Sequence, residues 1–101
     1  MFNNDKYITK GIQESIPLEL QLFMWNSINS LKNKDIQLDY LQVFTLTKPK
    51  YNEQHIQIIE HRQEIPEHKR KYKLNSINVI NAKIFVIDSG EYSTMMLSEE
   101  Y

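Results

Sequence analysis

The side chains best suited to metal binding lie in the second half of the chain: His55, His61 and His68, with carboxylates between them. Imidazole nitrogens and carboxylate oxygens are common zinc ligands. On one extended strand, however, His55 and His61 would stand about 20 Å apart at roughly 3.3 Å per residue, too far to bind one ion. Pairing His61 with His68 across two strands would bring together only two ligands. The sequence therefore predicts no metal site, and we expect surface or half-buried histidines.

Patterns typical of other catalytic sites do not occur. Asp88 and Glu91 flank an expected turn, and the chain contains no glycine-rich phosphate loop or nucleophile elbow. The absence of cysteine removes thiolate chemistry, cysteine-based zinc sites and disulfides. We therefore expect a protein that is not an enzyme and uses no cofactor.

The basic segment HKRKYK, residues 68–73, is the second candidate site. Read as a strand, it places Lys69, Lys71 and Lys73 on one face, with His68, Arg70, Tyr72 and Leu74 on the other. Lysines about 6.6 Å apart could follow the phosphates of a single strand, while a tyrosine stacks on a base. The candidate nucleic-acid-binding residues are Lys69, Arg70, Lys71, Tyr72 and Lys73. The same alternation is typical of a strand with one face in water, where lysines discourage edge-to-edge pairing, and we prefer that interpretation.

One main helix is expected over residues 17–33. Leu20, Met24, Ile28 and Leu31 recur at helical spacing, and Leu18, Leu22 and Trp25 widen the stripe. Ser15 is placed to cap the helix, and Pro17 suits its first turn. Phe23 lies off the apolar stripe, so either another element covers it or it anchors a partner.

The remaining segments are predicted strands, at residues 6–12, 40–47, 55–62, 68–74, 79–87 and 91–98. The last two read as a hairpin around Asp88-Ser89-Gly90, with Ile87 opposite Glu91 and Ile84 opposite Thr94. A break at Ile65-Pro66 predicts a corner or wide turn. The expected fold is α+β: one helix (about 17–33) on a curled, mainly antiparallel sheet of five or six strands that ends in a C-terminal hairpin. We expect a single domain, 1–101.

The two faces of this hairpin differ in character. One face, with Ile84 and Val86 opposite Thr94 and Tyr92, is uncharged and is expected to meet the helix. The other face is mixed, and the middle strands or a partner would have to cover it. The candidate partner-binding residues are Phe23, Phe85, Met95 and Leu97.

Charge and hydropathy narrow the possible partners. With 12 basic and 13 acidic side chains the formal net charge is −1, so no overall field draws the protein to nucleic acid or membrane. The longest apolar runs, LFMW and IFVI, are too short to cross a bilayer. The N-terminal residues do not read as a secretory signal, so we expect a cytoplasmic protein.

Four segments together resemble a known family: YITKGI, IPLELQLFMW, DYLQVFTL and AKIFVIDSGEYSTMMLSEEY. It is the family from low-GC Gram-positive bacteria, including staphylococci, known only as domain of unknown function 960. The resemblance implies a compact α+β domain with no assigned activity, and some family members come from mobile genetic elements. We therefore predict a non-catalytic protein–protein interaction or accessory domain that binds a protein partner or itself. The alternative is a weak nucleic-acid-binding accessory protein that uses strand 68–73.

Overall fold

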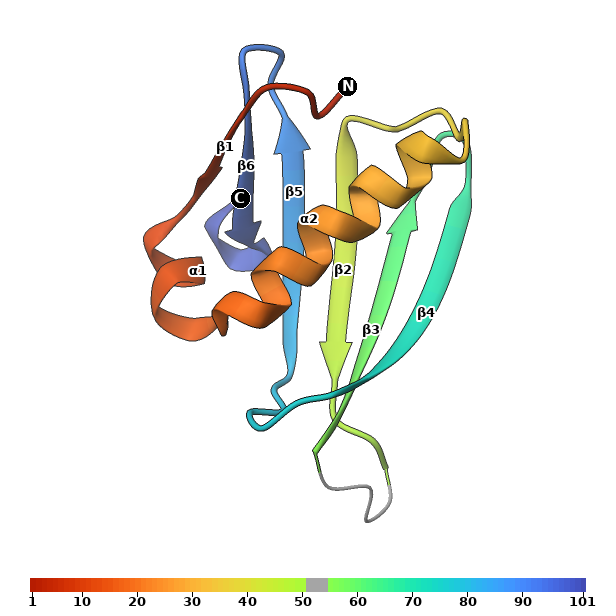
Figure 1. Ribbon diagram of the computed structural model, residues 1–101. Coiled ribbons are helices and arrows are strands. Elements are labelled where there is room, and N and C mark those ends of the chain that lie inside the picture. Colours follow the sequence, from red (N-terminus) through yellow and green to blue (C-terminus); the bar gives the residue numbers. More distant parts are fainter. Residues whose placement is uncertain (51–54) are drawn as a thin grey trace.

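One long helix lies across a six-stranded sheet in the computed structural model, which describes residues 1–50 and 55–101 (Figure 1). The helices are α1 (Lys10–Ser15) and α2 (Leu18–Asn33), followed near the C-terminus by the 3₁₀ turn η1 (Ser98–Glu100). The strands lie in the order β1 (Asp5–Ile8), β6 (Tyr92–Leu97), β5 (Ala82–Asp88), β2 (Leu41–Thr47), β3 (Ile56–Gln63) and β4 (His68–Asn75).

The predicted fold class is confirmed. Each pair of neighbouring strands in the described sheet is antiparallel except β1 with β6, which is parallel. The sheet is open, and β5 and β6 form the expected C-terminal hairpin. No helix in the described parts of the chain is long and apolar enough to cross a membrane.

Helix α2 confirms the central part of the predicted apolar stripe. Leu20, Met24, Ile28 and Leu31 are all buried against the sheet. Leu18 and Leu22 were expected to widen the stripe, but they are 66% and 53% exposed. These two leucines stand four residues apart and so form their own row on the helix, directed away from the sheet.

The helix also begins differently from the prediction. Pro17 occupies the N-cap position and makes no side-chain capping bond, while Ser15 is the last residue of α1. The single strand predicted at residues 6–12 is therefore wrong, because it divides into β1 and α1. Thr9 separates them, and its hydroxyl accepts a 3.3 Å hydrogen bond from the Ile12 backbone N–H. This local side-chain bond favours a helix start over a continued strand.

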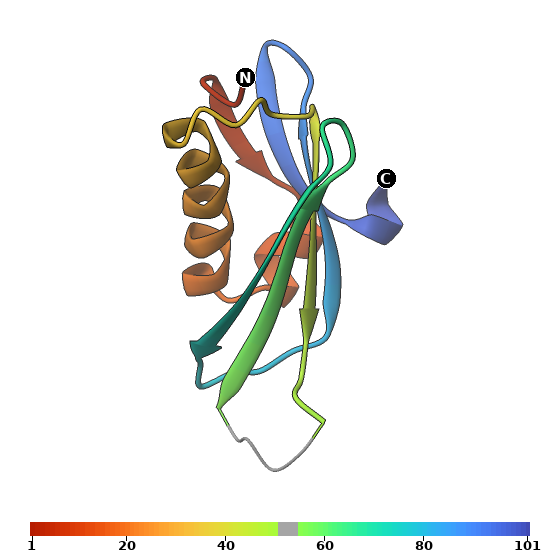
Figure 2. The same ribbon diagram turned by 90° about the vertical axis from the view of Figure 1, so that its right-hand side faces the viewer.

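The core fills the space between α2 and one face of the sheet (Figure 2). Phe44 and Leu46 of β2, Ile59 of β3 and Ile84 of β5 point toward the helix and are fully buried. Figure 2 shows α2 on one side of the sheet and η1 on the other. We call the side away from α2 the open face. Cross-strand partners share a face, and so the register assigns to the open face Asp5, Tyr7, Leu41, Val43, Thr45, Thr47, Ile56, Ile58, Glu60, Arg62, Lys69, Lys71, Lys73, Lys83, Phe85, Ile87, Tyr92, Thr94 and Met96.

The predicted register of the C-terminal hairpin is wrong. Ile87 lies opposite Thr94 rather than Glu91, a shift of three residues along β6. An odd shift exchanges the two faces of a strand. The prediction was right that Ile84 and Val86 face the helix, but the β6 residue that joins them is Met95, which is 0% exposed.

Contacts at the hairpin turn explain this register. The turn is longer than the predicted three residues, since the Ser89 N–H donates to the Tyr92 carbonyl at 2.9 Å. The Asp88 carboxylate is engaged by the backbone N–H groups of Phe2 and Gly90. Gly90 has φ +101°, a conformation that strongly favours glycine. The expected role of glycine in this turn is confirmed.

Strands β3 and β4 form a direct hairpin, with Gln63 opposite His68, rather than meeting at a corner. The intervening residues include a cis peptide bond at Ile65–Pro66. Along β4 the predicted alternation is confirmed. The three lysines are exposed on the open face, whereas His68, Arg70, Tyr72 and Leu74 are partly buried.

Candidate interaction surface

The centre of the open face is apolar. Leu41 of β2 lies opposite Ile87 of β5, and Phe85 of β5 lies between Val43 and Met96. Val43 is buried by these neighbours, and the other four side chains are half-buried. Below we call this group the apolar centre. No helix of the described residues covers it, and only η1 reaches toward it (Figure 2).

Charged residues lie on opposite sides of the apolar centre. The basic end comprises Lys69, Lys71 and Lys73 of β4 with Arg62 of β3. Lys69 Nζ lies 3.9 Å from the Glu60 carboxylate, and this surface pair of an exposed lysine and a half-buried glutamate contributes little to stability. The acidic end comprises Asp5 of β1 and Glu99 of η1, with Glu91 in the adjoining β5–β6 turn, and all three are exposed.

Aromatic rings occupy the acidic end of the open face. Tyr7 and Tyr92 meet edge to face with their ring centroids 5.7 Å apart. Tyr101 contacts Phe85 in the same manner at 5.7 Å, which places the residue after η1 over the apolar centre. Tyr7, Tyr92 and Tyr101 are all exposed. Exposed tyrosines beside apolar side chains are typical of protein interfaces.

The structure separates the four residues predicted to bind a partner. Phe85 lies on the open face. Phe23 lies on the helix side, half-buried, where its ring meets Tyr72 edge to face at 4.9 Å. Met95 belongs to the core, and Leu97 packs against the core from the same side. Of the apolar centre, only Phe85 was among the predicted partner-binding residues. Leu41 and Ile87 were not among them, and Met96 was missed because the predicted register turned it toward the helix.

The basic strand is divided in the same way. Lys69, Lys71 and Lys73 point to the open face, but Arg70 and Tyr72 point beneath α2. The Arg70 guanidinium donates to the Ser27 carbonyl at 3.0 Å and lies 5.3 Å from the centre of the Tyr72 ring. Neither side chain is positioned to contact a nucleic acid that lies on the lysines.

A buried polar network under α2 was not predicted. His61 Nδ1 lies 2.7 Å from Ser27 Oγ, and His61 Nε2 lies 2.7 Å from Gln42 Oε1. The Gln42 amide nitrogen donates to the Asp39 carbonyl and to Gln63, which leaves Oε1 to accept from the imidazole. His61 Nε2 therefore carries the proton, and Nδ1 accepts from Ser27.

The environment keeps this imidazole neutral. Burial and, to a lesser extent, the nearby positive charge of Arg70 lower the pKa of His61 from 6.5 to about 3. The ring also stacks on Phe44, with centroids 4.2 Å apart. One cue was available in the sequence: His61 alternates with Gln57, Ile59 and Gln63 on the buried face of β3.

The Ser27–His61–Gln42 order resembles a nucleophile, base and orienting group, but its location does not suit catalysis. Ser27 and His61 are 5% and 1% exposed beneath the helix. A nucleophile must reach its substrate, and in this conformation no substrate can approach Ser27. The network joins α2 to the sheet. In the described part of the chain, no three His, Asp or Glu side chains gather as a metal-ligand group.

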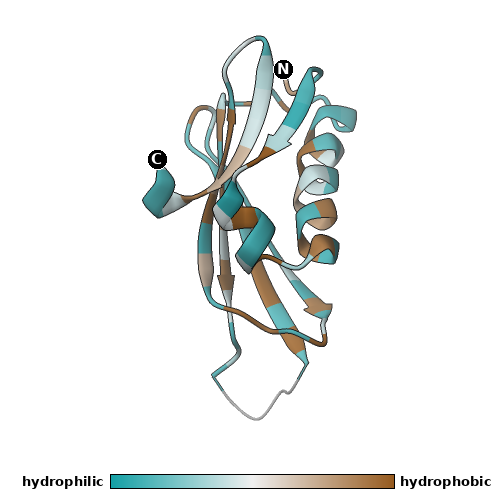
Figure 3. Ribbon diagram, turned by 90° about the vertical axis from the view of Figure 1, so that its left-hand side faces the viewer, coloured by the Kyte–Doolittle hydropathy of each residue, from teal (hydrophilic) through white to brown (hydrophobic). Residues whose placement is uncertain are grey.

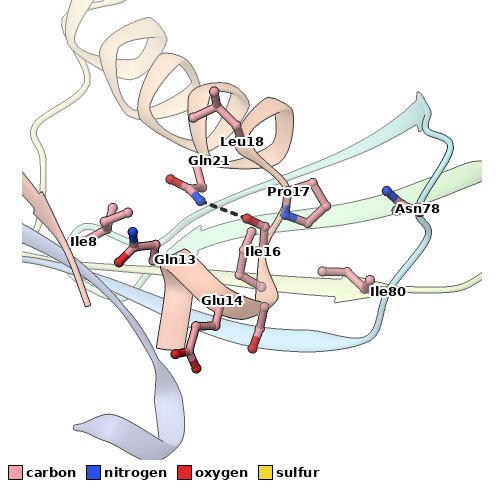
Figure 4. Close-up of a pocket in the computed structure, with 10 residues that line it drawn as sticks. Ile8, Gln13, Glu14, Ile16, Pro17, Leu18, Gln21, Asn78 and Ile80 are labelled. Atoms are coloured by element: carbon pink, nitrogen blue, oxygen red, sulfur yellow. Dashed lines mark hydrogen bonds between the residues drawn. The ribbon is translucent and has the colours of Figure 1, made fainter. Parts of the chain in front are cut away.

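A groove of about 670 Å³ lies at the junction of α1, α2 and the segment before β5 (Figure 4). Ile8, Ile16, Leu18 and Ile80 form its apolar lining. The Gln21 side chain already donates to the Ile16 carbonyl at 2.8 Å. Among the described residues, the one buried side-chain polar atom without a partner is Arg70 Nε, which is not among the groove residues. The groove therefore has no buried polar group left to recognise a ligand.

Comparisons with known proteins give the family and the fold. A crystal structure of a protein of unknown function from Enterococcus faecalis superposes with a TM-score of 0.79, covering 97% of this chain and 91% of that one. The two chains are 23% identical, so this likeness shows the fold alone. No curated protein matches the chain. The family described as "Staphylococcal protein of unknown function (DUF960)" matches residues 5–100. By this match over nearly its whole length, the chain belongs to the DUF960 family.

Proposed function

We propose that the protein is a non-catalytic interaction domain whose open face binds another protein chain. The observation that carries this proposal is the apolar centre, flanked on two sides by charged residues. Protein interfaces commonly have an apolar middle within a polar rim, and they are enriched in aromatic residues, methionine and arginine. Leu41, Phe85, Ile87 and Met96 provide the middle, and the basic and acidic ends provide the rim.

The size of the face also suits a protein partner. The six strands have four to eight residues each. At about 3.3 Å per residue and about 4.8 Å between strands, they give a face of roughly 600 Å² in projection. Side-chain relief raises the accessible area toward the ~800 Å² per partner of a standard interface. A small ligand, by contrast, binds in a concave site that surrounds it.

The lysine row supports a second candidate function, weak binding of single-stranded nucleic acid. Lys69, Lys71 and Lys73 share the open face at a spacing suited to phosphates. Glu60 lies among them and the acidic end lies across the sheet, which weakens the field that a polyanion would meet. We therefore prefer a protein partner.

We also propose that the protein is cytoplasmic. A chain without cysteine is unaffected by the reducing environment of the cytoplasm. An accessory role connected with mobile genetic elements is also part of it, supported by the family resemblance.

Site-directed photo-cross-linking in the cells that encode the protein tests the proposal. A benzophenone amino acid replaces Tyr92, which is 45% exposed on the open face. The matched control replaces Leu22, which is similarly exposed on the outer side of α2. We expect a discrete protein adduct from position 92 and none from position 22. Equal adducts from both positions, or none from position 92, would contradict the proposal.

A further inference from the structure

The distribution of charge on the open face indicates which chain covers it. The basic end contains Arg62, Lys69, Lys71 and Lys73, partly offset by Glu60. The acidic end, on the far side of the apolar centre, contains Asp5 and Glu99, and Glu91 lies in the adjoining β5–β6 turn. Of the cations that the register places on the open face, Lys83 of β5 lies nearest to this end, and its Nζ is 5.9 Å from the centroid of the Phe85 ring. The face is therefore positive at one edge, apolar in the middle and negative at the other edge.

We infer that the occupant is a second copy of this chain, packed face to face about a two-fold axis parallel to the strands. This inference rests on the proposed function of the open face. A two-fold axis lying in the interface and parallel to the strands exchanges the two edges of the sheet. Strand β4 of each copy then lies opposite β1 of the other, and β3 lies opposite β6. The lysines of each copy then face the carboxylates of the other, so the same charged contact forms at both sides of the interface. The two apolar centres meet in the middle.

The other in-plane two-fold axis, perpendicular to the strands, gives a worse interface. It places β4 against β4, so that the lysine rows of the two copies oppose each other. Like charges brought together across an interface are destabilising. The charge pattern therefore distinguishes between the two ways of packing this face on itself.

The position of η1 favours the same axis. Figure 3 shows η1 as a hydrophilic projection on the side of the sheet opposite α2. It follows β6 in the chain and contacts β5, so it lies on the acidic side of the midline between β5 and β2. An axis parallel to the strands places the two η1 turns at opposite ends of the interface. Each then meets the β2–β3 region of the other copy, beside the lysines of β4. The perpendicular axis would place both η1 turns at the same end.

Charge reversal tests the pairing of the two ends. The basic-end variant carries Lys69→Glu and Lys71→Glu, the acidic-end variant carries Asp5→Lys and Glu99→Lys, and Lys34→Glu is the control at the end of α2. Sedimentation equilibrium of the wild type should give a dimer with a Kd of roughly 1–50 µM, weakened by salt. Each variant alone should associate at least about tenfold more weakly, and an equimolar mixture of the two should recover the wild-type affinity. The control should associate like the wild type.

Cysteine cross-linking tests the axis, and the chain has no cysteine of its own to interfere. A mixture of Lys71→Cys and Glu99→Cys should form a covalent heterodimer with a short bismaleimide, and Lys71→Cys alone should form none. Efficient self-linking of Lys71→Cys would overturn the axis. Circular dichroism checks the fold of every variant. If a charge-reversal variant unfolds, cross-linking of Lys71→Cys with Glu99→Cys still tests the arrangement of the two copies.

The failure of this inference can be told apart from failure of the proposed function. If the wild-type protein stays monomeric at high concentration, the inference that a second copy covers the open face is wrong, whatever else binds there. If position 92 then cross-links to a different protein, the interaction surface remains and only its occupant changes. If the monomer instead binds oligo(dT) or oligo(U) with a steep salt dependence, nucleic acid covers the face, and both the inference and the preferred function are wrong.

Discussion

His61 Nδ1 lies 2.7 Å from Ser27 Oγ, and this buried hydrogen bond connects the middle of β3 to the middle of α2. On its other side the same ring bonds Gln42 of β2, so one imidazole joins three elements of the fold. A group with this position should make the stability of the protein depend on pH.

We expect stability to fall as the pH drops below about 6.5. The pKa of His61 is lowered from 6.5 to about 3 by burial, so the unfolded chain takes up a proton that the folded chain excludes. The stabilisation is fully present above the unfolded pKa and is lost as the pH falls from there toward 3. Between about pH 7.5 and pH 5 the free energy of unfolding should decrease by about 2 kcal/mol, measured by urea denaturation.

The control for this prediction is His61→Gln, which should be less stable at neutral pH but should lack the decrease. His68→Gln should still show the decrease in stability at low pH, because the His68 ring is not buried as the His61 ring is. An independent check is the NMR titration of the His61 ring, which should show no protonation down to about pH 4.5. Titration near pH 6 would contradict the prediction.

Ser27→Ala should lower the free energy of unfolding by about 1–3 kcal/mol. The change leaves His61 Nδ1 without a donor and removes one of the acceptors of the Arg70 guanidinium. Ser30→Ala is the matched control, because Ser30 offers Arg70 only a long 3.4 Å contact. Comparable losses from the two variants would show that the network does not depend on Ser27.

Two adjacent methionines test the observed hairpin register. Met95 is buried in the core, so Met95→Ala should cost about 2–5 kcal/mol of stability. Met96 lies half-buried on the open face, so Met96→Ala should cost about 1 kcal/mol or less in the monomer. Thermal or urea denaturation measures the loss of stability in both variants. A larger loss for Met96→Ala than for Met95→Ala would show that the register expected from the sequence is the correct one.

Gly90→Val should destabilise the β5–β6 turn by about 1–2 kcal/mol or more, while Ser89→Ala should have little effect. A side chain at position 90 would meet no atom within 4 Å, so the cost comes from the backbone at φ +101°. Differential scanning calorimetry of both variants measures it. Equal, small shifts would indicate that the turn has another conformation.

Phe85→Ser should leave the monomer folded and weaken its association. Phe85 is half-buried on the open face and packs there against Tyr101 rather than in the helix-side core. Light scattering together with circular dichroism separates the two effects. Loss of the folded signal would show that the ring instead supports the core.

The sequence predicted the elements whose periodicity is carried by many residues. The stripe Leu20, Met24, Ile28 and Leu31 identifies one face of α2, and strict alternation identifies the exposed lysines of β4. Both patterns repeat often enough that one misplaced residue does not change the interpretation.

Features determined by contacts between distant segments could not be predicted in this way. The register of β6 depends on a turn held by Asp88 and Phe2, which lie 86 positions apart in the chain. The burial of Arg70 and His61 depends on Ser27, on a different element. A single polar residue does not repeat at regular spacing, so the sequence does not indicate its position in the fold. The candidate site could therefore be predicted only in part: Phe85 and the lysines were expected, but Met96 and the arrangement of charges were not.

The parallel pairing of β1 with β6 has a consequence for synthesis of the protein. Ile8 lies opposite Met95, so β1 pairs with the strand that is made last of the six in this sheet. Strand β1 must remain unpaired until β2, β3, β4, β5 and β6 have been made. Such long-range pairing slows folding and leaves a strand exposed in the meantime. We therefore expect the nascent chain to be most vulnerable to proteases and to aggregation just before β6 emerges.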